Sequence, residues 1–118
     1  MKKLLRKLPT PASVLVRDVG QASFVTLVDN QGREFVHFDV GAPTSFNKHT
    51  FPKPFAHTIC ADAIVILSHW DWDHLHGAHL WPDLLKCNWI VPNQIVGPGA
   101  ARLALQLKNS GRLFVWPS

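Results

Sequence analysis

The sequence predicts one mixed α/β domain of the α+β sandwich type, in which an antiparallel meander is followed by a strand-helix-strand-helix-strand order. Two observations lead to this fold class. The first forty residues hold runs of β-branched and aromatic residues separated by turn formers. The rest alternates short apolar runs with stretches of helix formers. With 118 residues, the chain has the usual length of one domain, and we expect helices packed on a sheet.

The first eleven residues differ in charge from the rest of the chain. They hold four of the twelve Lys and Arg residues, and the remaining eight are balanced by eight Asp and Glu. We therefore expect residues 1–11 to form a basic tail and residues 12–118 to form the domain. Such a run is typical of a solvated tail, and also of a patch for nucleic acid or acidic membrane. No aromatic residue is interleaved with it, so nucleic acid has weak support as a partner.

Three strands are expected to form the meander, and each is rich in β-branched or aromatic residues. The run Asp29-Asn30-Gln31-Gly32 is a strong hairpin signal between the second and third strands. The expected strands are 13–19, 23–28 and 33–40.

The second part of the chain predicts alternating strands and helices after a loop rich in turn formers at 41–54. The most apolar run, 63–67, reads as a buried strand. The expected elements after it are a helix within 74–85 interrupted by Pro82, a strand at 88–92, a helix at 100–108 and a strand at 113–116. These helices cover one face of the sheet, so we expect a complementary chain or a homo-oligomer on the open face, or a sequence that is part of a longer protein.

The sequence predicts a cytoplasmic protein with no membrane span. No apolar run approaches the ~20 residues that cross a bilayer. The basic start continues into Leu8-Pro9-Thr10-Pro11 and not into the apolar region of a signal peptide. Cys60 and Cys87 are far apart and form no CxxC pair, which argues against a disulfide framework or a Cys-rich zinc site.

A dense polar segment, Ser68–Ala78, follows the buried strand and holds three His and two Asp. The carboxyl end of a buried strand is where α/β proteins present ligands. Alternate residues of an extended segment project to one side, and imidazole with carboxylate suits zinc, iron or manganese. Ligands on one short loop can reach two metal ions about 3.5–4 Å apart. The predicted metal ligands are His69, Asp71, Asp73 and His74.

This segment resembles the signature of the metallo-β-lactamase superfamily, HxHxDH between a buried strand and a helix. Ser68-His69, Asp73-His74 and Gly77 match that signature, and Asp71 stands at the position of its second His. The resulting HxDxDH form is similar to the hydrolase domain of the ComEC-type DNA-uptake proteins and their soluble relatives. Two upstream segments support the resemblance: Asp18–Ser23 is similar to a DVGQG(D/S) turn, and Phe38–Gly41 to an (F/I)DxG segment.

The resemblance implies the N-terminal half of an αββα fold and a metal-dependent hydrolase. Its substrate would be an ester, phosphodiester, lactone or amide, with a slight preference for phosphodiesters. The implied centre is a Zn²⁺ pair, for which Mn²⁺ or Fe are alternatives. It implies that His69 and Asp71 bind the first ion, that Asp73 and His74 bind the second, and that Asp73 is the catalytic residue that orients the attacking water. Asp39 is then expected to support the metal loop by hydrogen bonds.

The family also needs a later His, a bridging Asp and a further His from a second half of the fold. This chain has no His after His79 and no Asp or Glu after Asp83. Two interpretations therefore stay open. The chain is the N-terminal half of a hydrolase, or it is a non-catalytic truncated remnant or interaction module that keeps part of the metal site. Whether it acts as an enzyme alone is left undecided at this stage.

Overall fold

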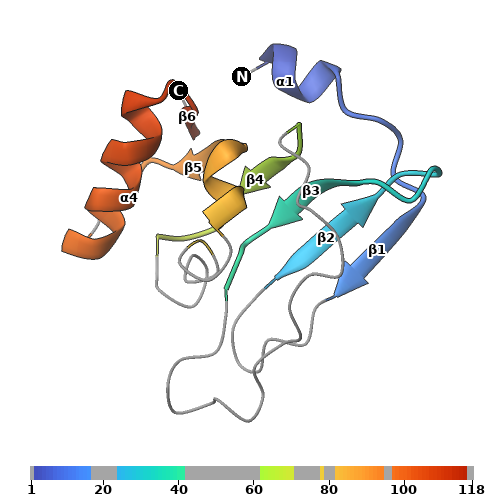
Figure 1. Cartoon of the computed structure of the whole chain (residues 1–118), viewed down its shortest axis with the longest axis horizontal. Coiled ribbons are helices and arrows are strands. Elements are labelled where there is room, and N and C mark those ends of the chain that lie inside the picture. The colour runs from blue at the N-terminus through green and yellow to red at the C-terminus, as the bar shows by residue number, and fades with distance from the viewer. Residues whose placement is uncertain are drawn as a thin grey trace, which may run out of the picture.

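The computed structural model describes residues 2–16, 24–41, 62–70, 78, 82–94 and 97–116. It is an α+β structure with a six-stranded mixed sheet in the order β1-β2-β3-β4-β5-β6 (Figure 1), so the general class expected from the sequence is confirmed. The elements described are α1 Lys2–Arg6, β1 Ser13–Val16, β2 Val25–Val28, β3 Glu34–Phe38, β4 Ile64–Ile66, the 3-10 helix η2 Pro82–Lys86, β5 Asn88–Pro92, α4 Pro98–Asn109 and β6 Leu113–Trp116.

The first three strands form the expected antiparallel meander. The turn between β2 and β3 is built on Asp29, whose Oδ1 accepts the backbone N–H of Gln31 and of Arg33, both at 2.9 Å. The Arg33 guanidinium donates to Oδ2 at 3.2 Å, and Gly32 takes the left-handed conformation at φ 80° that glycine adopts without steric cost. The hairpin expected at residues 29–32 is therefore confirmed.

From β3 onward the strands are parallel, and α4 connects β5 to β6 on one face of the sheet. The main core lies on this face, where Val65 and Trp89 pack with Leu103 and Leu107 of α4. Trp89 is fully buried, and its indole N–H donates to the carbonyl of Leu84 at 2.9 Å. Burying a polar N–H is tolerated because it keeps a partner, so η2 and β5 are joined through this side chain.

The opposite face of the sheet is apolar and only partly covered by the described part of the chain. Strand pairing places one row of apolar side chains across all six strands. Phe38 and Val16 of this row remain 43% and 72% exposed. The row, called the apolar row below, consists of Val16, Val25, Phe38, Ile66, Ile90 and Phe114.

The segment expected to be a basic tail contains the short helix α1, which lies against this apolar face. Leu5 lines an apolar hollow together with Ile66 and Ile90, and Leu4 lines a second cavity beside Ile64. Leu4 and Leu5, which stand among the basic residues of this segment, account for its position on the sheet. These apolar side chains gain contact with the sheet while the charged groups stay in water. Within the ranges described above, no helix combines the length and the apolar character that crossing a membrane requires.

Acid should destabilise the β2–β3 hairpin. The backbone N–H of Arg33 lowers the pKa of Asp29 most, the N–H of Gln31 and the guanidinium of Arg33 add to the effect, and desolvation opposes it. Because the pKa of Asp29 is lowered in the folded protein, the carboxylate stabilises the fold at pH values above its unfolded-state pKa of about 3.9. This contribution is lost as the pH falls through the folded-state pKa. We expect thermal unfolding of Asp29→Asn to depend less on pH than wild type below about pH 4. Asp62→Asn, at an exposed carboxylate, is the control, and an unchanged pH dependence of Asp29→Asn would contradict the assignment.

Candidate metal centre

The predicted metal loop begins where three parallel strands end side by side. The ladder of hydrogen bonds continues past the strands, with Asp39 N–H donating to the carbonyl of Ile66 at 2.8 Å and Leu67 N–H to that of Ile90 at 2.9 Å. The segments after β3, β4 and β5 therefore leave the sheet at a common level. We call this the carboxyl edge, defined by Asp39, Ser68 and Gln94. In parallel sheets, ligands are presented at this end.

Asp39 is buried at the carboxyl edge, with 2% of its surface exposed, and it binds Ser68, the residue before the HxDxDH motif. Its Oδ1 accepts the backbone N–H of Ser68 at 2.8 Å, and its Oδ2 accepts the Ser68 hydroxyl at 2.7 Å. The backbone of Asp39 is left-handed, at φ 56°, which costs about 1–2 kcal/mol in a residue with a Cβ. Hydrogen bonds to a charged group contribute about 1.5–3 kcal/mol each, so the two bonds outweigh the strain.

His69 is exposed at the start of the loop, and its Nδ1 lies 3.2 Å from the Ser68 hydroxyl oxygen. The Ser68 hydroxyl gives its single proton to Asp39, because a carboxylate can only accept. Toward His69 the same oxygen can therefore act only as an acceptor, so Nδ1 carries a proton. In the neutral ring the lone pair then lies on Nε2. Metal-binding histidines are arranged in this way, with one ring N–H held by a hydrogen bond while the other nitrogen binds the ion.

Trp70 follows His69 and anchors the loop in the main core. It is 7% exposed and belongs to the core cluster, as alternation with His69 predicts. Its indole N–H donates to the carbonyl of Pro92 at 3.0 Å, and its backbone N–H donates to Oε1 of Gln94 at 3.1 Å. Residues on both sides of His69 are thus fixed by side chains from the carboxyl edge.

Gln94 was not among the candidates that the sequence predicted. The available signal was its position two residues after the strand predicted at 88–92, since polar residues that follow parallel strands lie at one edge of the sheet. Nothing in the sequence, however, shows that its amide oxygen contacts the loop after β4.

The other predicted ligands, Asp71, Asp73 and His74, lie outside the described residues, as does the Asp18–Ser23 segment. Among the residues that are described, no group of three or more His, Cys, Asp or Glu side chains is placed to hold a metal ion. Of the four predicted ligands, the structure therefore describes only His69. Its imidazole is a donor that zinc accepts. The remaining ligands stay predictions.

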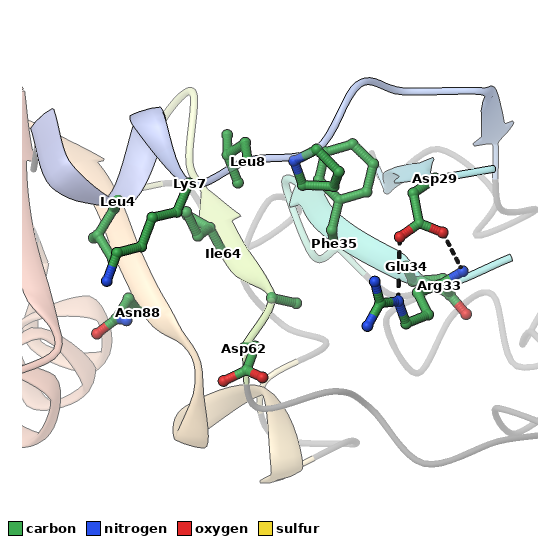
Figure 2. Close-up of a pocket in the computed structure, with 12 residues that line it drawn as sticks. Leu4, Lys7, Leu8, Asp29, Arg33, Glu34, Phe35, Asp62, Ile64 and Asn88 are labelled. Atoms are coloured by element: carbon green, nitrogen blue, oxygen red, sulfur yellow. Dashed lines mark hydrogen bonds and ion pairs between the residues drawn. The ribbon is translucent and has the colours of Figure 1, made fainter. Parts of the chain in front are cut away.

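Two cavities lie at opposite ends of the parallel strands. The one in Figure 2 has a volume of about 420 Å³ and lies at the amino ends, beside Glu34, Ile64 and Asn88. On its wall the Asp29 carboxylate binds Arg33 (Figure 2). This cavity lies at the end of the strands away from His69, so we do not assign it to the centre.

The apolar hollow beside Leu5, Ile66 and Ile90 has a volume of about 390 Å³. Ser68 lies in its wall, so the hollow adjoins the candidate centre. The rest of its lining is almost entirely apolar and comes from α1, β4, β5 and β6. Any group bound at the carboxyl edge would thus meet an apolar surface on this side.

No family model matches the sequence, and comparisons with curated proteins and with solved structures return no match. What this chain indicates about its function therefore comes from the motif and from the contacts among Asp39, Ser68, His69 and Trp70.

Loss of the Asp39 carboxylate should release the loop. We expect Asp39→Ala to lower the free energy of unfolding by about 2–4 kcal/mol, because it removes two hydrogen bonds at a buried site. Asp39→Gly should cost about 1 kcal/mol less than Asp39→Ala, because glycine adopts the left-handed backbone without strain. Urea denaturation of the three proteins measures both differences. An Asp39→Ala variant as stable as wild type would show that these bonds do not hold the loop.

Proposed function

We propose that this chain is a metal-dependent hydrolase module of the metallo-β-lactamase type, corresponding to the N-terminal half of that fold. One observation supports the proposal above the others. The Asp39 carboxylate, the Ser68 hydroxyl and the His69 imidazole form a hydrogen-bonded series at the first residue of the HxDxDH motif. This series fixes the proton on Nδ1 and gives Nε2 the lone pair that a ligand needs.

In this proposal the four motif residues hold a zinc pair, with His69 and Asp71 at the first ion and Asp73 and His74 at the second. Zinc bound there would lower the pKa of water and polarise the scissile bond of an ester, phosphodiester, lactone or amide. Asp39 keeps His69 in one tautomer and one orientation through Ser68. Asp73 orients the water, which is the role that the resemblance gives to it.

In this proposal the other metal ligands come from outside the motif. We propose that a complementary chain or a second copy supplies them and covers the open face that carries the apolar row. Support comes from the exposure of Phe38 and Val16 within that row, and of Trp116 on the same face at 59%, because apolar side chains gathered on one face are typical of an interface.

The same exposed face favours the second candidate function, a non-catalytic interaction module. Light scattering distinguishes a monomer from an associated form. The two functions are separated by hydrolysis of model esters and phosphodiesters by the associated form, which only the first predicts.

Metal binding tests the main proposal. We expect the purified chain to bind at least about one Zn²⁺, and His69→Ala to weaken binding by roughly 100-fold or more, because removing a ligand exceeds the 10–100-fold cost of removing a supporting residue. Affinity should fall as the pH is lowered, because protons compete with the metal ion for its ligands. Isothermal titration calorimetry measures both effects.

His49→Ala removes a histidine that the motif does not contain, and it is the matched control for this titration. Its affinity should equal that of wild type. A stoichiometry well below one Zn²⁺ per chain that His69→Ala leaves unchanged would refute the proposal for this chain.

A further inference from the structure

We infer that Gln94 is a positioning residue of the candidate metal centre, acting through the backbone of Trp70. The inference rests on the proposed function, because it concerns how the chain presents His69 to a metal ion. The sequence pattern does not assign Gln94 any role, and the resemblance does not either. Its contact with Trp70 carries the argument.

The residues on both sides of His69 are held by side chains that follow different strands. On one side, Asp39 accepts the N–H of Ser68 at 2.8 Å from the end of β3. On the other side, Gln94 accepts the N–H of Trp70 at 3.1 Å from the segment after β5. His69 therefore lies between Ser68 and Trp70, whose backbone N–H groups are each bound by a side chain that follows a neighbour of β4 in the sheet. Loss of either contact removes one of the two restraints on the backbone beside His69.

The hydrogen bond that Trp70 donates to Gln94 is its second contact with the end of β5 and the segment after it. The indole N–H of Trp70 already donates to the Pro92 carbonyl at 3.0 Å, which brings the residue against the strand. The indole contact fixes the side chain, and the Gln94 contact fixes the backbone. A binding site needs its groups held to about 0.5 Å and 10–20°, and Trp70 separates His69 from the next predicted ligand, Asp71. The bond from the Trp70 N–H thus restrains the peptide group that follows His69.

The contact of Gln94 with Trp70 depends on an acceptor oxygen. Gln94 is exposed, so its own amide group stays hydrated while Oε1 accepts the Trp70 N–H. The role requires only an acceptor oxygen at that distance. Glutamate keeps such an oxygen, and methionine has a similar length without one. The pair Gln94→Glu and Gln94→Met therefore separates the hydrogen bond from the loss of side-chain volume.

The test is a titration of the full chain with Co²⁺, followed by its visible absorption, for wild type, Gln94→Met, Gln94→Glu and Gln106→Met. Gln106 is an exposed glutamine on α4 and serves as the matched control. We expect Gln94→Met to weaken Co²⁺ binding about 10- to 100-fold, as loss of a supporting partner does. Gln94→Glu should stay within about threefold of wild type, and Gln106→Met should not differ from it. Hydrogen exchange of the Trp70 amide, measured without metal, should be faster in Gln94→Met than in Gln94→Glu.

Each other outcome overturns the inference in a distinguishable way. If wild type binds Co²⁺ and Gln94→Met binds equally well, Gln94 does not position the centre and the proposed function stands. If Gln94→Met and Gln94→Glu are weakened equally, the acceptor oxygen is not the cause. If wild type binds no Co²⁺, the proposed function and the inference fail together.

Discussion

The pair of hydrogen bonds between Asp39 and Ser68 is the contact on which the candidate centre depends. It joins residues that are 29 positions apart in the sequence, and it ties the end of β3 to the loop after β4. The same carboxylate orients the Ser68 hydroxyl, which in turn places the proton on Nδ1 of His69. One buried charge thus controls the position of the loop and the protonation of its first predicted ligand.

Parallel pairing of β3, β4 and β5 makes this contact available. Because the three strands run in one direction, their carboxyl ends meet at one edge, and Asp39, Ser68 and Gln94 converge there. Crossovers through η2 and α4 then build the core on one face, while the apolar row on the other face is only partly covered by α1. The candidate centre at the carboxyl edge therefore lies beside an apolar surface.

Much of the fold follows from local sequence pattern. The β-branched runs, the Asp29 turn and the helix before Gly111 are each determined by neighbours in the chain, and the structure contains all three. The helix at Lys2–Arg6 was not predicted, because five residues form no stable helix alone and need contact with the sheet. The Gln94 contact and the left-handed Asp39 depend on which strands lie side by side. The metal chemistry of the motif stays a prediction from its spacing. Of the side chains that contact the described start of the motif, Asp39 was expected from the resemblance, and Gln94 was not.

The central claim is that Asp39 and Ser68 fix the tautomer of His69. A long-range ¹H–¹⁵N correlation of the imidazole, recorded without metal, measures this most directly. We predict a protonated Nδ1 and an unprotonated Nε2 in wild type, and a loss of this preference in Asp39→Ala. A His69 ring protonated at Nε2 in the wild-type protein would contradict the account.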